Sequence, residues 1–168
     1  MNKFTELLNL TCENIKKEKG WKNKSRIIGE SIEECILTIN CPICQLKELM
    51  KYQVNEKSRD IYCNNCKSDF QVKGTKTSSL KKDKIKLLGA EYKTTCNSLL
   101  NNNINYLIVL YSENKNIDYY NVEQILLINY IDIENECIIP RTPLKSTARR
   151  AGWQGCYLVF NKYEKLEI

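Results

Sequence analysis

The feature that most constrains this chain is a pair of Cys-x-x-Cys motifs between residues 41 and 66. Cys41 and Cys44 form the first motif, and Cys63 and Cys66 form the second after an insert of 18 residues. Four thiolates at this spacing are typical of a structural zinc site, whose tetrahedral shell leaves no open position for a substrate. The sequence therefore predicts a zinc knuckle over residues 41–66, and the fold must bring both motifs to one point.

The remaining composition favours an ordinary domain rather than a secreted scaffold. The chain has 168 residues, nine cysteines and a net charge of +6. An odd cysteine count without a secretory signal indicates a reducing, intracellular compartment, so we expect a cytoplasmic protein with four cysteines on zinc and five as small hydrophobes. No run of 18 apolar residues occurs, so we expect no membrane partner. The length predicts one domain over residues 1–168.

A second pattern overlaps the second cysteine pair. Asp60 lies three residues before Cys63, and ten residues separate it from Gln71-Val72-Lys73. An acid followed at this distance by Gln-x-Lys is a variant of the D-x(n)-(D/E)-x-K arrangement that metal-dependent nucleases use. The chain contains no histidine, so any acid–base or metal chemistry falls to carboxylates, amides, lysines and thiolates.

Strand periodicity predicts how these residues meet. Residues 59–63 and 70–73 have the β-branched and aromatic content of short strands. Side chains alternate along a strand, so Gln71 and Lys73 point to one face, and Phe70 and Val72 to the other. If the two strands pair as a hairpin, Asp60, Gln71 and Lys73 converge on one surface. A zinc ion at the turn would then fix the register.

The rest of the chain predicts a mixed α/β domain around one central sheet. We expect a helix over residues 1–19 that Gly20 ends, and a helix with an apolar run over residues 23–39. Further along, the pattern predicts a loop over 74–79, a helix over 86–100, a buried strand over 106–111, and strand or helix over 118–132.

Three sets of polar residues have alternative interpretations. Glu30 either reaches the metal site or is a solvated helix residue, and the solvated interpretation is the simpler one. Lys81 and Lys82 begin a cluster with Lys84 and Lys86. Such a run is usually a solvated face, but a run that follows a nuclease-like strand has better odds of contacting phosphate. The net charge agrees with a nucleic-acid partner without establishing one.

The last informative segment contains Arg149, Arg150 and Trp153 between prolines and glycines. Paired arginines beside an aromatic residue suit contact with phosphates and base faces, which makes these three residues candidate DNA-binding residues. The alternative, a buried structural tryptophan with two arginines on the surface, explains the same residues equally well.

This segment also carries a family resemblance. Residues 143–156, PLKSTARRAGWQGC, resemble the corresponding segment of the Dam-replacing, or DpnI, family of restriction endonucleases. The likeness extends to residues 60–73, which are similar to that family's combined zinc and active-site segment. Cys41-Pro-Ile-Cys44 matches its first cysteine pair, and residues 24–30 resemble its early helix, so the resemblance covers nearly the whole chain.

The resemblance implies a PD-(D/E)xK restriction-endonuclease core with an embedded four-cysteine zinc site. It implies Mg²⁺-dependent cleavage of double-stranded DNA at GATC sites that carry N6-methyladenine. Asp60 would be the metal-binding aspartate and Lys73 the catalytic lysine. Asp60, the Gln71 side chain and the Val72 backbone carbonyl would hold Mg²⁺, while zinc is structural. We expect a monomer.

The sequence departs from the family in two respects. Gln71 stands where the family has glutamate, which removes a charge that a hard cation prefers. No winged-helix domain of the kind found in DpnI follows, so we expect the nuclease domain alone. The main alternative is a catalytically weak or inactive module that binds methylated DNA. A zinc-stabilised protein-interaction domain is a third possibility, but it explains neither Lys73 nor the arginine segment.

Overall fold

The structure is a computed structural model that describes residues 2–53, 58–114, 116, 119–147 and 149–167. Its α-helices are α1 (Lys3–Lys19), α2 (Lys24–Ile36) and α3 (Tyr92–Asn101). Its strands are β1 (Leu49–Lys51), β2 (Ile61–Cys63), β3 (Asp69–Lys76), β4 (Leu80–Lys81), β5 (Lys84–Glu91), β6 (Ile104–Asn114), β7 (Tyr119–Ile128), β8 (Ile138–Pro140), β9 (Gly155–Phe160) and β10 (Glu164–Leu166). Short 3₁₀ turns cover Thr77–Ser79, Tyr130–Asp132 and Asn135–Cys137.

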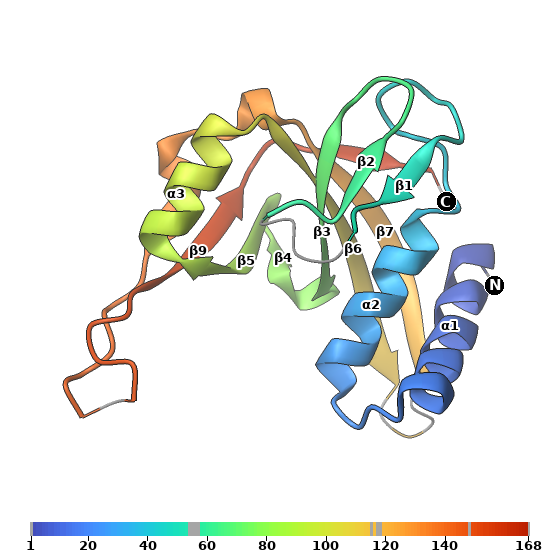
Figure 1. Cartoon of the computed structure of the whole chain (residues 1–168), viewed down its shortest axis with the longest axis horizontal. Coiled ribbons are helices and arrows are strands. Elements are labelled where there is room, and N and C mark those ends of the chain that lie inside the picture. Colours follow the sequence, from blue (N-terminus) through green and yellow to red (C-terminus); the bar gives the residue numbers. More distant parts are fainter. Residues whose placement is uncertain (1, 54–57, 115, 117–118, 148, 168) are drawn as a thin grey trace.

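The strands form two sheets. The larger has the order β1-β2-β3-β6-β7-β10, and the smaller has the order β4-β5-β9-β8. Strands β3 and β6 run parallel, whereas the other pairs are antiparallel. Figure 1 shows α1 and α2 on one side of the larger sheet, and the smaller sheet with α3 on the other. The expected mixed α/β architecture with a mixed central sheet is confirmed.

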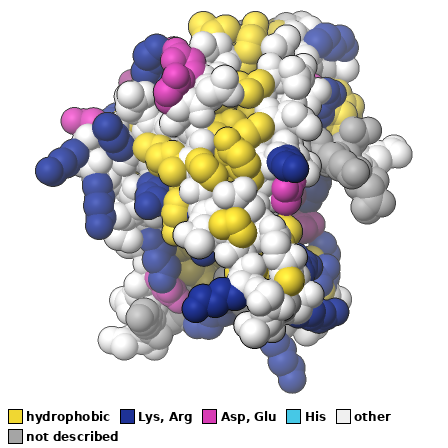
Figure 2. All heavy atoms as spheres, turned by 90° about the vertical axis from the view of Figure 1, so that its left-hand side faces the viewer, with side chains coloured by type: hydrophobic (Ala, Val, Ile, Leu, Met, Phe, Trp, Pro, Cys, Tyr) yellow, Lys and Arg dark blue, Asp and Glu magenta, His cyan; other side chains and the backbone are white. Residues whose placement is uncertain are grey.

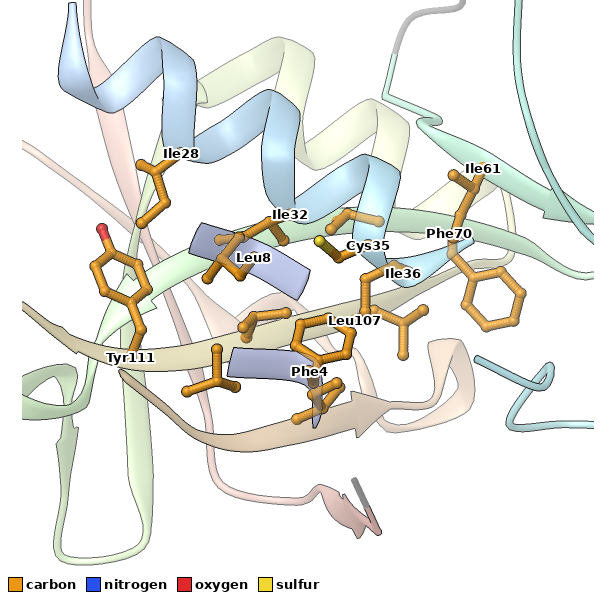
Figure 3. Close-up of a cluster of buried hydrophobic side chains, with 14 of the residues drawn as sticks. Phe4, Leu8, Ile28, Ile32, Cys35, Ile36, Ile61, Phe70, Leu107 and Tyr111 are labelled. Atoms are coloured by element: carbon orange, nitrogen blue, oxygen red, sulfur yellow. The ribbon is translucent and has the colours of Figure 1, made fainter. Parts of the chain in front are cut away.

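Strand β6 lies at the centre because both of its faces are buried. Leu107, Val109 and Tyr111 pack with α1 and α2 in one core cluster. Figure 3 shows this cluster, with α2 side chains lying over β3 and β6. Tyr106, Ile108 and Leu110 point the other way, into the cluster beneath the smaller sheet and α3. A continuous apolar run is what a strand covered on both faces requires, and the predicted buried strand over 106–111 is confirmed.

The two N-terminal helices have clear end signals. Asn2 caps α1 through a bond from the Phe4 N–H to its side chain, and Asn23 caps α2 in the same way through Arg26. Gly20 ends α1 in the left-handed conformation, with φ of 61°. The predicted helix over 1–19 and its end at Gly20 are therefore confirmed.

Helix α2 packs closely on β3 at Gly74. A Cβ atom at Gly74 would lie 2.3 Å from the Cδ1 atom of Ile32. A larger residue there would force the Ile32 side chain of α2 to shift. The strand itself continues to Lys76, so the predicted loop over 74–79 was wrong at its start; only Thr77–Ser79 form a turn.

The predicted helix over 86–100 was also wrong in its first half. Residues up to Glu91 belong to β5, where Ile85 and Leu87 are buried and Lys84 and Lys86 are exposed. This alternation of period two was present in the sequence. The helix begins only at Tyr92, because the Glu91 carboxylate accepts a bond of 2.7 Å from the Thr94 N–H and caps it.

For residues 118–132 the strand alternative was the correct one within the described part. Residues 119–128 form β7, which pairs with β6, and a 3₁₀ turn follows. None of the helices in the described ranges has an apolar stretch long enough to span a bilayer.

Candidate active site and metal centre

The four predicted zinc ligands lie together at the turn between β2 and β3. The Sγ atoms of Cys41, Cys44, Cys63 and Cys66 all lie within 4.8 Å of one another. The Cys41–Cys66 sulfur pair is 3.7 Å apart and the Cys44–Cys63 pair 3.6 Å. A tetrahedral ion with Zn–S bonds of about 2.3 Å has sulfur–sulfur edges of about 3.8 Å. The cluster therefore has the size and the donor set for one zinc ion, and none of these cysteines is in a disulfide.

Each cysteine pair folds into the same local knuckle. The Gln45 N–H donates to the Cys41 carbonyl at 2.8 Å, and the Lys67 N–H donates to the Cys63 carbonyl at 3.0 Å. Gln45 and Lys67 both have positive φ, of 62° and 59°. The repeated turn directs the two sulfurs of each pair towards one centre.

The environment divides the four thiols into two kinds. Burial raises the pKa of Cys41 to about 12, and burial also raises the pKa of Cys63. The Leu46 backbone N–H lowers the pKa of Cys44 to about 7. The pKa of Cys66 is lowered too, because hydrogen bonds from Ser68 outweigh the opposing effect of burial. The lowered pKa values of Cys44 and Cys66 favour the thiolate, the form that binds a metal.

The candidate catalytic residues Asp60 and Gln71 are in direct contact. Strands β2 and β3 pair antiparallel, with Ile61 opposite Phe70, and the Asp60 N–H donates to the Phe70 carbonyl at 3.0 Å. The Gln71 side-chain amide donates a hydrogen bond to Oδ2 of Asp60. The same oxygen accepts the Val72 backbone N–H at 2.8 Å. The expected hairpin thus brings the carboxylate next to Gln71.

A neighbouring ion pair fixes the segment that carries Asp60. The Arg59 guanidinium lies 3.0 Å from Oδ2 of Asp69, the first residue of β3. The Tyr52 hydroxyl donates to the other oxygen of Asp69 at 2.5 Å. These bonds tie Tyr52 and Arg59 to the first residue of β3, in addition to the backbone hydrogen bonds that Asp60 makes with Tyr52 and Phe70.

Lys73 lies on the same face of β3 as Gln71, as the alternation predicted. Both residues line a cavity of about 300 Å³ between the two sheets, to which β5, α3 and β6 also contribute. Its other walls come from Ser58, Leu88, Gly89, Ala90, Thr95, Ser98, Leu99, Tyr106 and Leu158. Phe70 and Val72 point into the opposite core cluster. Gln71 and Lys73 therefore place an amide and an ammonium group in the wall of this cavity, whose lining mixes polar and apolar side chains, and the Asp60 carboxylate contacts Gln71.

Glu33 is a carboxylate in the electrostatic environment of Asp60 that the sequence reasoning missed. Its pKa is raised, first by burial and next by the negative charge of Asp60, while Lys51 at 3.2 Å opposes the shift. The carboxylate of α2 that interacts with Asp60 is thus Glu33. The signal for it was helical spacing, because Glu30, Glu33 and Glu34 share one face of α2.

Glu30, the residue that the sequence singled out on this helix, does not lie at the metal centre. Its carboxylate pairs with Lys19 at 3.0 Å and with Lys51 at 3.1 Å. Burial opposes these lysines, but their hydrogen bonds keep the pKa of Glu30 below its usual value. Glu30 is therefore a partly buried, ion-paired helix residue and not the solvated one of the simpler interpretation.

The two predicted DNA-binding lysines lie in different places: Lys81 ends β4, and Lys82 lies in the turn between β4 and β5. Lys81 lines a second cavity, of about 530 Å³, together with Lys84 and Lys86. Lys82 is exposed at the tip of the turn, where it has a positive φ of 48°. The two residues therefore face different surroundings.

The arginine segment is an extension of the β8–β9 hairpin. Arg149 and Arg150 are exposed, and the segment projects away from the two sheets in Figure 1. Trp153 is half-buried and packs on Gly155, where a Cβ atom would come within 2.9 Å of the indole. None of the described residues that line the 300 Å³ cavity belongs to this segment. The structure therefore does not bring it to Asp60 and Lys73, and its contact with DNA stays a prediction.

Comparison with known protein families identifies the family that the chain resembles. The model of the family described as DpnI: Dam-replacing family matches residues 7–165. The match includes all four cysteines, Asp60, Gln71, Lys73 and the arginine segment, and it covers nearly the whole chain.

Proposed function

The chain belongs to the Dam-replacing, or DpnI, family, and from this membership we propose that it is a Mg²⁺-dependent endonuclease that cuts double-stranded DNA at GATC sites carrying N6-methyladenine. The family indicates a restriction-type nuclease that acts on methylated DNA. The observation that carries the proposal is the β2–β3 pairing, which brings Asp60 to the strand whose one face presents Gln71 and Lys73.

The oxygen atoms around Asp60 suit a hard cation. The Asp60 carboxylate, the Gln71 amide oxygen and the Val72 carbonyl are the kinds of ligand that Mg²⁺ prefers. In a strand residue the N–H and C=O point to the same side, so the Val72 carbonyl lies on the edge of β3 that faces Asp60. The ion would polarise the scissile phosphate when bound.

Lys73 supplies the remaining chemistry in this proposal. Its ammonium group orients the attacking water and stabilises the charge that builds on the phosphorane. Lys73 and Gln71 lie two residues apart on one face of β3, which is the spacing of the lysine and the acid in a PD-(D/E)xK strand. We therefore assign β2 and β3 to the catalytic hairpin of such a core.

A plasmid experiment tests the function. The purified protein is incubated with Dam-methylated and unmethylated plasmid, with Mg²⁺ or with Mn²⁺. We expect discrete fragments from methylated plasmid only. Cutting of both plasmids would show that cleavage does not require methylated adenine. A protein that binds methylated DNA but cuts neither plasmid in either metal would overturn the nuclease proposal.

One observation favours the alternative of a methylated-DNA reader without catalysis. The Asp60 carboxylate already accepts hydrogen bonds from Gln71 and from the Val72 N–H. A carboxylate satisfied in this way has less to gain from a cation than one that faces a second carboxylate. The plasmid experiment separates the two functions, because a reader binds the methylated duplex without breaking it.

A further inference from the structure

The outer face of the smaller sheet combines a line of lysines with exposed apolar residues. Ile85 and Leu87 of β5 point into the core, whereas Lys84, Lys86 and Leu88 point outward. Leu88 is 67% exposed, which is unusual for a leucine in the middle of a sheet. Figure 2 views the molecule from the side that carries α3 and shows a band of hydrophobic side chains flanked by Lys and Arg.

The cavity of about 530 Å³ on this face, which we call the lysine pocket, has a strongly basic lining. Lys81, Lys84 and Lys86 line it together with the hydroxyl-bearing residues Thr75, Ser78 and Ser79, and no acidic residue is among its lining residues. Within the described part of the chain, none of the three lysines forms an ion pair. Lys84 also lines a neighbouring cavity with Asp132, Glu134 and Glu136, but no carboxylate lines the lysine pocket itself. Three ammonium groups around one hollow favour an anionic ligand there.

The apolar part of the lining shows what kind of anion fits. The Lys86 ammonium lies 3.9 Å from the ring centroid of Tyr157, and Leu88 and Val159 complete the wall. The pocket is larger than a phosphate group. A nucleic-acid strand alternates phosphates with less polar sugars, and so presents both surfaces at once.

Leu88 joins this pocket to the candidate active site. It lines both the lysine pocket and the 300 Å³ cavity that contains Gln71 and Lys73. The β5–β9 register shifts between Leu88 and Glu91, which marks a bulge at this point. The two cavities are therefore neighbours along one surface, with Leu88 between them.

We propose that the lysine pocket binds backbone phosphates of the same DNA strand whose scissile phosphate lies at Lys73, and that Leu88 contacts the sugar between them. This inference rests on the proposed nuclease function and adds Lys84, Lys86 and Leu88 to the DNA-contacting residues. It assigns phosphate contact to Lys81, which lines the pocket, and not to Lys82 at the tip of the turn.

The test measures binding of a labelled methylated GATC duplex as a function of salt, without added Mg²⁺ so that no cutting occurs. Each phosphate contact contributes about 0.9 to the slope of log K against log salt. Lys84→Ala and Lys86→Ala should each lower the slope by about that amount, and weaken binding by about eightfold at 0.1 M salt. Leu88→Ala should weaken binding without changing the slope, because an apolar contact releases no counterions.

Matched controls remove the same charge elsewhere. Lys17 and Lys22 are exposed residues at and beyond the end of α1, on the opposite side of the larger sheet. Lys17→Ala and Lys22→Ala should leave the slope unchanged. Thermal melting of every variant checks that weaker binding does not reflect unfolding.

Several outcomes would overturn the inference while leaving the nuclease proposal intact. One is a protein that cuts methylated plasmid but whose Lys84→Ala and Lys86→Ala variants bind DNA with the same salt slope as the wild type. Another is a pocket for free nucleotides: deoxyadenosine monophosphate would then bind the wild type and lose affinity in these variants, with duplex binding unaffected. If Lys17→Ala changed the slope as much as Lys84→Ala, the loss of slope would reflect net charge and not a contact in the pocket.

Discussion

The side-chain amide of Gln71 donates a hydrogen bond to the carboxylate of Asp60 across the β2–β3 pair. In this orientation the amide nitrogen, not the oxygen, faces the proposed metal ligand. A cation that binds Asp60 must displace the N–H or turn the amide over so that its oxygen faces the ion. Gln71 therefore competes with the metal as well as contributing to its site.

The first prediction follows from this competition. Gln71→Glu removes the amide and adds a negative charge beside Asp60, so the Mg²⁺ concentration for half-maximal cleavage should fall by about tenfold. The wild type should need more Mg²⁺ than the variant, or should improve with Mn²⁺, because Mg²⁺ demands near-ideal octahedral geometry. Titration of both metals against initial cleavage rate measures this. An unchanged or increased Mg²⁺ requirement in the variant would contradict it.

The second prediction concerns the residues that have no substitute. Asp60→Ala and Lys73→Ala should abolish cleavage, because the first removes the only carboxylate in the proposed ligand set and the second removes the ammonium group. Neither change should prevent folding, since Lys73 lines the cavity, Asp60 lies just before β2, and neither belongs to a core cluster. Circular dichroism and duplex binding are the controls. Residual cutting in Lys73→Ala would assign its role to another group.

The third prediction concerns zinc. Purified protein should contain one zinc ion per chain, and Cys63→Ser should lower the thermal midpoint by about 10 °C or more, because metal binding contributes directly to folding. Cys96→Ser is the matched control, since Cys96 lies outside the four-sulfur cluster. Elemental analysis and melting curves decide it. A folded, chelator-resistant sample without zinc would refute it.

The fourth prediction concerns the arginine segment. If Arg149 and Arg150 contact phosphates, replacing either with alanine should weaken binding to every duplex and lower the salt slope by about 0.9. If Trp153 lies near the methylated base, Trp153→Ala should reduce the preference for methylated DNA more than the affinity. Unaltered binding in all three variants would leave the segment as part of the fold.

The fifth prediction uses the raised pKa of Glu33. As the pH falls through this pKa, Glu33 becomes protonated, the site loses negative charge, and the metal requirement rises. Glu33→Gln should therefore raise the Mg²⁺ requirement by about tenfold at neutral pH and make it less dependent on pH. Glu34→Gln is the matched control, because Glu34 also pairs with Lys51, at 2.8 Å. Equal behaviour of the two variants would leave Glu33 outside the site.

The sequence predicted those parts of the site that depend on local pattern. Cysteine spacing placed the zinc cluster, and alternation along β3 placed Gln71 and Lys73 on one face. It missed what depends on tertiary contacts. The electrostatic effect of Asp60 on Glu33 depends on the packing of α2 against β3 at Gly74, and the lysine pocket needs β5 as a strand. The predicted helix over 86–100 hid the strand alternation of β5. Residues 92–101 are indeed helical, and the boundary between strand and helix is set by the cap at Glu91.

The zinc knuckle also has a consequence for the order of folding. Asp60 follows a long insert, and ordering such a segment against β3 has an entropic cost that grows with the length of the open loop. A zinc ion bound by Cys44 and Cys63 would join the ends of that insert, so a chain that had bound the ion would search a much smaller set of conformations before Asp60 meets Gln71. In a newly synthesised chain, metal uptake would therefore precede the alignment of the active site. The supply of zinc would set the moment at which a DNA-cutting protein becomes able to cut.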